Sequence, residues 1–249
     1  MKVFRGFESL PPFQNAVATM GSFDGVHSGH RVLLEHVKCI AKEIASESIV
    51  LTFDPHPRYV LDTGEGMKLL STLEEKIHLL EQAGIDNLII IPFTEEFSRT
   101  SHQDFISNNI ASIGIGNLVV GYNHRFGHNK GGDYNYLNSH GGTLKITMVE
   151  QQQVSSNKVS STIVRQEIAK GNIEYANNLL SQPYIIMGEC GERNMVNIDS
   201  NKQLPPDGIY SAIVNGMNDA ITIADGRLYL NNKVVQDKVL IKLIDITTE

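Results

Sequence analysis

Short apolar runs alternate with amphipathic segments along the first part of the chain. The runs at residues 16–20, 48–53, 88–93, 118–122 and 143–149 have the length and composition of buried strands. Apolar residues recur at helical intervals in three segments between them, one containing Leu33, Val37, Ile40 and Ile44 and the others at 72–83 and 103–113. Thr72 and Glu75 have the spacing of a capping box. Strands that alternate with helices predict an α/β fold with a parallel sheet and helices on both faces.

The pattern changes after residue 149. Residues 161–170 and 173–180 read as two consecutive helices separated by Gly171, and Pro183 ends this helical stretch. Short β-type runs follow at 184–187, 209–214, 220–223, 227–230 and 239–246, with turn signals at Asn215-Gly216, Asp225-Gly226 and Asn231-Asn232. The sequence therefore predicts a larger domain at residues 1–183 and a small antiparallel β domain at residues 184–249.

Charge and composition narrow the class of protein. The chain of 249 residues carries 21 basic and 28 acidic side chains, a net charge of −7, which argues against broad binding to nucleic acid. No stretch reaches the roughly 18 apolar residues of a membrane helix, and no signal peptide follows Met1. We expect a cytoplasmic protein. Cys39 and Cys190 lie far apart without metal-type spacing, so two buried or idle thiols are expected rather than a disulfide or redox pair.

The segment GSFDGVHSGH, residues 21–30, directly follows the first predicted strand. A loop between a parallel strand and the next helix lies at the carboxyl edge of the sheet, where ligands of open α/β folds bind. Its glycines allow a sharp turn and close approach to a ligand, and Ser28 can cap a helix whose free N–H groups attract phosphate. His27 and His30 would then donate hydrogen bonds or positive charge to phosphoryl oxygens.

Two other interpretations of the histidine pair stay open. His27 and His30 could be metal ligands, although no third His, Cys or carboxylate lies at a matching local spacing. They could also be structural histidines with no chemical role.

Three further segments carry candidate chemistry. TFDPHP (52–57) follows a predicted strand, and its prolines would present Phe53, Asp54 and His56 rigidly, unless it is simply a proline-rich turn with a solvated histidine. VGYNHRFG (120–127) offers Asn123 for hydrogen bonds and Phe126 for stacking, although Phe126 could equally pack in the core. In VSSTIVR (159–165) the hydroxyls lie at a helix start and Arg165 can fork onto phosphate, although such hydroxyls can also be a plain N-cap.

These four segments together resemble a known family. HSGH (27–30) fits the HxGH signature of the nucleotidyltransferase superfamily, and all four motifs occur in the order found in the FAD synthetase module of bifunctional bacterial riboflavin kinase/FAD synthetases. The resemblance covers roughly residues 1–183. It implies a Rossmann-like domain that transfers AMP from ATP to FMN, releasing pyrophosphate, with Mg²⁺ on the phosphates. The phosphate nucleophile is already an anion, so the site must mainly align the substrates and neutralise charge.

The resemblance also implies roles for individual residues. The expected catalytic residues are His27, His30, Asn123 and Arg165. The expected ATP-binding residues are Gly21, Ser22, Phe23, Asp24, Gly25, Gly29, Ser160, Ser161 and Thr162. The expected flavin-binding residues are Phe53, Asp54, Pro55, His56, Tyr122 and Phe126. The metal ligands are unassigned.

The chain departs from the family pattern in its last part. Residues 184–249 are fewer than the family's kinase barrel contains, and residues 191–197 stand where a PTAN motif is expected. Leu240 occupies the position of the catalytic glutamate of active kinases, and a leucine cannot accept a proton. We therefore expect a shortened riboflavin-kinase-like barrel without kinase activity, serving as a structural cap or an oligomer contact.

A milder departure lies in the first domain, where His124 replaces a residue that is more often aromatic. Two alternative functions remain: a nucleotidyltransferase for another phosphate monoester, and a non-catalytic sensor of flavin or nucleotide. Only the first alternative would keep the HxGH chemistry.

Overall fold

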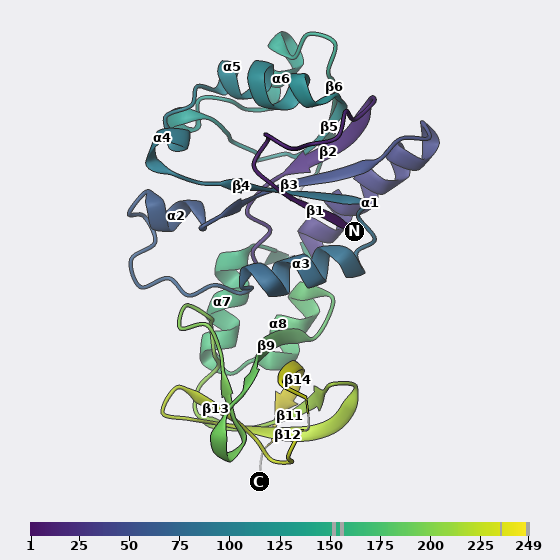
Figure 1. Cartoon of the computed structure of the whole chain (residues 1–249). Coiled ribbons are helices and arrows are strands. Elements are labelled where there is room, and N and C mark those ends of the chain that lie inside the picture. The colour runs from purple at the N-terminus through teal and green to yellow at the C-terminus, as the bar shows by residue number, and fades with distance from the viewer. Residues whose placement is uncertain (151–152, 155–156, 235, 248–249) are drawn as a thin grey trace. The chain divides into compact units, whose positions relative to one another are not determined.

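The computed structural model describes residues 1–150, 153–154, 157–234 and 236–247 of the chain (Figure 1). The chain forms two compact units. Unit 1 comprises Met1–Phe23, Gly29–Gly66 and Leu79–Gln152, and unit 2 comprises Asp24–Ser28, Met67–His78 and Gln153–Glu249. Two short segments of the first part of the sequence, one of them inside the histidine-containing turn, therefore belong to the same unit as the C-terminal residues.

A six-stranded sheet in which every pairing is parallel forms the centre of unit 1. Its spatial order is β1-β4-β3-β2-β5-β6, with bounds Lys2–Arg5, Asn87–Pro92, Ser48–Asp54, Ala16–Met20, Ile115–Gly121 and Lys145–Val149. The five predicted strands are confirmed. β1 was not predicted, because three of its four residues are exposed and it gives no apolar run.

The strand order reverses beside β2, since β3 and β4 follow on one side and β5 and β6 on the other. The loops after the carboxyl ends of β2 and β5 therefore lie at a topological switch point, where ligands of such sheets bind. The histidine-containing turn follows β2, and the VGYNHRFG segment overlaps the end of β5.

Helices cover both faces of this sheet, as predicted (Figure 1). Helix α1 (Ser28–Glu43) buries Leu33, Leu34, Val37 and Ala41. Ile44, expected on the buried face, lies beyond the helix end and is 39% exposed. The capping box of α3 (Leu73–Gln82) forms as expected, because Thr72 N donates to Glu75 and Glu75 N donates to Thr72.

The predicted helix at 103–113 is composite. It consists of α5 (His102–Asp104), a π-helical turn (Phe105–Ile110) and a 3-10 turn (Ala111–Ile113). Phe105, Ile106 and Ile110 pack into the core on one side of the sheet. Further short helices are α2 (Pro57–Val60), α4 (Glu95–Ser98), α6 (Tyr134–His140) and a 3-10 turn at His128–Lys130.

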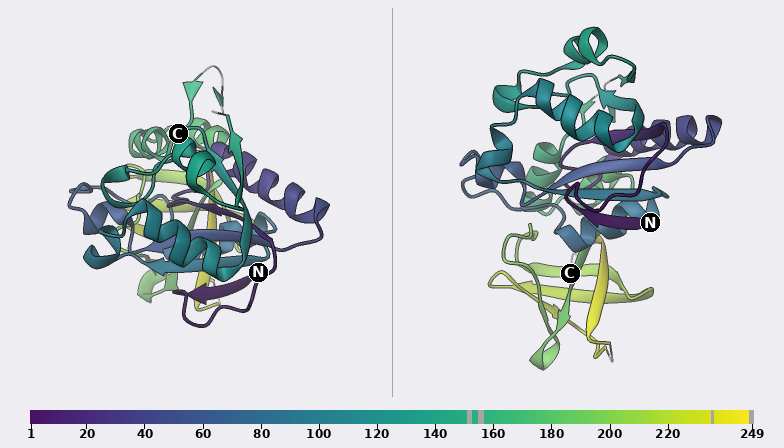
Figure 2. Two further views of the ribbon diagram at one scale, coloured as in Figure 1. Left: turned by 90° about the horizontal axis from the view of Figure 1, so that it is seen from above. Right: turned by 45° about the horizontal axis from the view of Figure 1, so that its top comes forward.

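Unit 2 combines two helices with a closed barrel, coloured green to yellow in Figure 2. Helices α7 (Ser161–Lys170) and α8 (Ile173–Leu180) have the predicted bounds, and Gly171 ends α7 in the left-handed conformation. The barrel order is β10-β13-β12-β11-β14-β9, with bounds Met195–Asn197, Arg227–Leu230, Met217–Ala224, Gly208–Val214, Lys238–Ile246 and Tyr184–Cys190. The predicted turns at Asn215-Gly216 and Asp225-Gly226 are confirmed, since all four residues have positive φ.

One apolar core runs through unit 2. Val164, Ile168 and Leu179 of the two helices belong to the same cluster as Tyr184 and Tyr210 of the barrel strands. This shared core explains why the helices group with the barrel. The predicted boundary near residue 183 divides the chain by sequence order. The compact units divide it differently, because residues 153–183 and two earlier segments belong to the unit that contains the barrel.

Cys39 and Cys190 are free cysteines; Cys39 is exposed and Cys190 is half-buried, so neither is a buried thiol. Among the described residues, no helix is long and apolar enough to cross a membrane.

Candidate functional site

The turn after β2 has an unusual backbone. Phe23, Gly25 and Val26 have φ values of +48°, +80° and +42°. A left-handed conformation is costly for phenylalanine and valine, and such strain persists only where the surroundings fix it. Both side chains are buried. Ser28 was expected to cap the following helix; instead it is the first residue of α1, and its Oγ is buried without a hydrogen-bond partner among the described residues.

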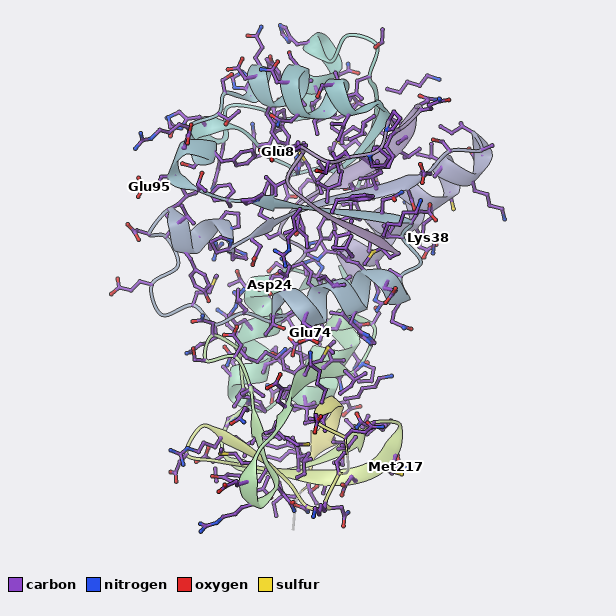
Figure 3. All side chains as sticks on the ribbon, in the orientation of Figure 1. Glu8, Asp24, Lys38, Glu74, Glu95 and Met217 are labelled. Atoms are coloured by element: carbon purple, nitrogen blue, oxygen red, sulfur yellow. The ribbon has the colours of Figure 1, made fainter. Side chains whose placement is uncertain are left out.

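Asp24, labelled in Figure 3, connects the turn to the VSSTIVR segment within unit 2 through its hydrogen bonds. Its Oδ2 accepts a hydrogen bond from Arg165 Nη2 at 2.8 Å, and its carbonyl oxygen accepts one from Ser161 Oγ at 2.9 Å. The Asp24 side chain is 2% exposed and that of Arg165 is 13% exposed. Arg165 Nε also donates to the carbonyl oxygen of Lys68 at 2.6 Å. The structure thus joins two of the four motifs through an ion pair whose carboxylate is buried and whose guanidinium keeps some exposure.

Ser160, Ser161 and Thr162 have different surroundings. Ser160 is the N-cap of α7, with its side chain accepting from Ile163 N, so the capping interpretation of this residue is confirmed. Ser161 is the hydroxyl bonded to Asp24, and Thr162 is exposed. The start of α7 therefore presents backbone N–H groups and one exposed hydroxyl, a set suited to an anion.

His27 is 8% exposed and belongs to the same unit as Asp24. Burial lowers its pKa to about 4, and the nearby carboxylate of Asp24 only partly opposes that shift. The imidazole is therefore neutral near pH 7, so in this state it offers a hydrogen bond rather than a positive charge. His30, in α1, packs its ring 5.0 Å from that of Phe23.

A cavity of about 640 Å³ opens in unit 1, a volume within the usual range for small-molecule pockets. Gly21 and Ser22 of the turn line it together with Phe53 and Phe126. Three phenylalanines that belong to none of the four motifs complete the aromatic wall: Phe93, Phe97 and Phe105. Neighbouring rings of this wall meet at 5.5 to 6.2 Å between centroids. Neighbouring rings are edge-to-face or tilted, with 47° to 82° between their planes, so the wall is aromatic but not flat. Such a lining offers ring faces and edges to an aromatic ligand.

The loop after β5 forms the polar side of the cavity, with His124, Arg125, His128 and Lys130. The His124 ring stacks on Phe126, with centroids 5.8 Å apart and planes 18° apart. Burial lowers the pKa of His124 to about 4. Its Nε2 is enclosed without a hydrogen-bond partner among the described residues. The replacement noted in the sequence therefore keeps a ring stacked on Phe126 but adds polar nitrogens.

Other predicted flavin residues do not line this cavity in the described structure. His56 caps α2, since its Nδ1 accepts from Arg58 N. Tyr122 is exposed at the turn after β5, as is Asn123, which was expected to be catalytic. Asp54 and Pro55 lie at the end of β3, beyond Phe53, and the Asp54 carbonyl accepts from Phe93 N. Whether these residues meet a ligand stays a prediction.

No group of three or more His, Cys, Asp or Glu side chains that could hold a metal ion occurs among the described residues. The carboxylate of Asp24 is occupied by Arg165 and by Ser71 N. The described part of the chain thus forms no ready metal cage, and the histidine pair lacks the further ligands of a structural metal site.

The motifs meet in two groups. Gly21, Ser22, Phe53 and Phe126 belong to one cavity, so the first three motifs contribute to it. Asp24, Ser161 and Arg165 form the second group, which joins the first motif to the fourth. The turn after β2 is the segment common to both groups.

Comparisons with known proteins agree with the motif pattern. A family model described as FAD synthetase matches residues 11–163. Curated proteins named bifunctional riboflavin kinase/FMN adenylyltransferase are similar over most of the chain. The protein from Bacillus subtilis is 32% identical, and the match covers 94% of this chain and 79% of that protein. The protein from Escherichia coli K12 is 30% identical, and the match covers 88% of this chain and 75% of that protein.

A solved structure shares the fold over nearly the whole length. It is a chain from Streptococcus pneumoniae titled macrolide-efflux protein, with a TM-score of 0.87, 21% sequence identity, and coverage of 99% of this chain and 100% of that one. At this identity the likeness concerns the fold alone.

Proposed function

Because the chain belongs to the FAD synthetase family and is therefore a nucleotidyltransferase, we propose that it transfers the adenylyl group of ATP to FMN, giving FAD and pyrophosphate. The observation that carries the proposal is the double role of the turn after β2. Its first residues line an aromatic cavity in unit 1, and Asp24 pairs with Arg165 in unit 2. Such a turn can serve both a flavin and a nucleotide.

The flavin ring is assigned to the aromatic cavity. Phe53 and Phe126 would contact the isoalloxazine ring, and the basic side chains of the loop after β5 suit the phosphate of FMN. Asp54, Pro55, His56 and Tyr122 remain proposed flavin contacts.

ATP is assigned to the turn and the start of α7. Gly21, Ser22, Phe23, Asp24, Gly25 and Gly29 would shape the backbone around the phosphates, with Ser160, Ser161 and Thr162 at the helix start. Mg²⁺ would enter with ATP, bound to phosphate oxygens, since Mg²⁺ is commonly held by substrate phosphates and few protein ligands.

In the proposed reaction an oxygen of the FMN phosphate attacks the α-phosphorus of ATP. The new P–O bond forms as the bond to the pyrophosphate oxygen breaks, and the leaving group takes the electron pair. No protein nucleophile is needed, because the attacking phosphate is already an anion. His27 and His30 would donate hydrogen bonds to phosphoryl oxygens, Arg165 would neutralise developing charge, and Asn123 would orient the acceptor.

We further propose that the chain lacks riboflavin kinase activity, although the relatives from Bacillus subtilis and Escherichia coli are named as bifunctional. Leu240 lies on β14 opposite Met187 of β9, and an aliphatic side chain cannot serve as the base for a riboflavin hydroxyl. FMN would then come from a separate kinase reaction. A cytoplasmic location and a barrel that acts as a cap or oligomer contact complete this proposal.

The test is to incubate the purified chain with FMN, MgATP and pyrophosphatase and to separate flavins by chromatography. FAD formation supports the proposal. Flavin binding without conversion would favour a sensor, and adenylylation of another phosphate monoester in place of FMN would favour a nucleotidyltransferase with a different acceptor. A parallel incubation with riboflavin and MgATP should yield no FMN.

A further inference from the structure

Lys202 is a fully buried lysine in unit 2, placed between β10 and β11. Its side chain is 0% exposed, and Nζ donates to Glu75 Oε2 at 2.6 Å and to the carbonyl oxygens of Leu70 and Ile185 at 2.7 Å each. Nζ also lies 4.2 Å from the centre of the Tyr184 ring. All three N–H donors of the ammonium group are therefore used, which fixes the position of the side chain.

Glu75, the partner of Lys202, is equally buried and fully bonded. Its Oε2 also accepts from Thr72 N at 2.8 Å, and its Oε1 accepts from Met187 N at 2.8 Å. A buried ion pair is costly to form, and removal of one partner leaves an uncompensated charge. The Glu75–Lys202 pair thus holds the start of α3 against strand β9 and the segment around Lys202.

Leu70, whose carbonyl oxygen accepts from Lys202, directly precedes the residue that contacts the turn after β2. Leu70 is followed by Ser71, whose N–H donates to Asp24 Oδ1 at 2.9 Å and whose Oγ accepts from Gly25 N at 2.9 Å. Asp24 in turn pairs with Arg165. All of these residues belong to unit 2.

Leu70 also packs against the turn directly. A Cβ on Gly25 would lie 2.9 Å from Leu70 Cδ1 and 3.0 Å from Leu70 Cβ, so the two residues approach as closely as a glycine allows. A shift of Leu70 or Ser71 would therefore change both the packing and the hydrogen bonding of the turn.

We propose that Lys202 is a positioning residue for adenylyl transfer: by fixing Leu70 and Ser71, it sets the placement of Asp24 and Arg165 at the proposed ATP site. This inference rests on the proposed function, because it takes Asp24 and Arg165 as groups that serve ATP. It gives the barrel a role independent of riboflavin phosphorylation. Displacements of about 1 Å at a reacting centre can cost roughly a hundredfold in rate, so such positioning can matter.

The test replaces the ion pair by neutral groups of similar size in the double variant K202M/E75Q. The amide side chain introduced in place of Glu75 keeps one acceptor oxygen for the N–H groups near it, and no buried charge is left unpaired. We expect a folded protein whose kcat/KM for MgATP falls about tenfold, while the Kd for FMN, measured by flavin fluorescence without ATP, changes by less than about twofold. FMN binding should be preserved because its proposed cavity is formed by unit 1.

A matched control is available on the same helix. Glu74 and Lys238 also join α3 to the barrel, at 2.9 Å, but their side chains are 55% and 62% exposed. K238M should leave both kcat/KM and FMN affinity unchanged, because exposed pairs contribute little.

The outcomes separate this inference from the proposed function. Wild-type protein that makes no FAD overturns the proposed function and the positioning role with it. Wild-type protein that makes FAD, together with a folded double variant of equal kcat/KM, overturns only the positioning role and leaves Lys202 as a structural brace. If the double variant does not fold, S71A tests the next link: a lower kcat/KM for MgATP with unchanged FMN affinity supports the role, and unchanged kinetics overturn it.

Discussion

Asp24 and Arg165 form a largely buried ion pair, 141 residues apart in the sequence, with 2.8 Å between Oδ2 and Nη2. The arginine also donates through Nε to the carbonyl oxygen of Lys68. These bonds use two of the five N–H donors of a guanidinium group, so the fork keeps further donors for phosphate oxygens. The pair thus places a cation beside the turn while its partner carboxylate limits the net charge before ATP arrives.

Replacing both Asp24 and Arg165 by neutral side chains should separate the contribution of this pair to stability from its contribution to FAD formation. Arg165→Ala alone leaves the buried Asp24 carboxylate without its cationic partner. Breaking a fully buried pair in this way lowers the free energy of unfolding by about 3–5 kcal/mol, and we expect a smaller decrease here because Arg165 keeps some exposure. The double variant R165M/D24N removes both charges, so we expect thermal unfolding close to that of the wild type but FAD formation reduced at least about a hundredfold. FAD formation at the wild-type rate would remove Arg165 from the mechanism.

Gly25 should tolerate no side chain. It has φ +80°, and a Cβ would meet Leu70 at 2.9 Å, so Gly25→Ala combines backbone strain with a clash. We expect a loss of about 1–3 kcal/mol in the free energy of unfolding, measured with urea. Gly66→Ala is the control, because Gly66 also has positive φ (+68°) but has nothing within 4 Å of the added atom. Equal losses for the two variants would show that contact with Leu70 has no part in the effect.

Local signals made much of unit 2 predictable. The bounds of α7 and α8 follow from Ser160 as a cap and from Gly171, which adopts the left-handed conformation at a helix end. Asn215-Gly216 predicted a tight turn for the same kind of local reason. β10 escaped notice because its three residues are too few to show a period.

Long-range contacts of the site could not be predicted in the same way. The turn at residues 21–30 was identified from glycines and histidines, but its ion pair with Arg165 depends on how distant segments pack. Phe93, Phe97 and Phe105 line the cavity, yet they share no motif: Phe93 directly follows β4, Phe97 lies in α4 and Phe105 begins the π-helical turn. The four motifs were found by composition and order, whereas their division into two groups follows from tertiary packing.

Gly132 supports the aromatic wall of the cavity. It pairs with Phe126 through both backbone hydrogen bonds, and a Cβ at this position would lie 2.5 Å from the Phe126 ring. Gly132→Ala should displace that ring and weaken FMN binding about tenfold, equivalent to about 1.4 kcal/mol, as measured by quenching of flavin fluorescence. Gly142→Ala, where no atom lies within 4 Å, should leave FMN affinity unchanged. Equal affinities in all three proteins would contradict the assignment of the ring to this cavity.

Stability should fall on mild acidification because of His27. Its folded-state pKa is about 4, against an ordinary value of 6.5, so the unfolded chain takes up the proton first as the pH falls. The free energy of unfolding should therefore be unaffected by this group above pH 6.5 and fall between pH 6.5 and 4, by up to about 1.4 kcal/mol per pH unit. His124 should add a smaller decrease in the same window, since its side chain keeps some exposure.

Urea unfolding measures this decrease when it is repeated at about pH 7.5, 6 and 5, which covers the region above the ordinary pKa of histidine and the upper part of the range between pH 6.5 and 4. His27→Gln cannot bind the proton and should show a shallower pH dependence than the wild type. Identical pH profiles would show that His27 does not contribute to acid sensitivity.

The histidine pair itself offers the sharpest test of the proposed chemistry. His27 is buried and neutral, and His30 packs on Phe23, so glutamine and asparagine replacements preserve more of the packing than alanine does. We expect H27Q and H30N each to lower kcat for FAD formation by about 10²–10³-fold, the range found when one hydrogen-bond donor to a developing charge is removed. Circular dichroism and FMN affinity should remain close to wild type, since neither residue lines the flavin cavity. Undiminished turnover in a folded variant would assign that histidine a structural role, and a loss of turnover matched by a loss of folding would do the same.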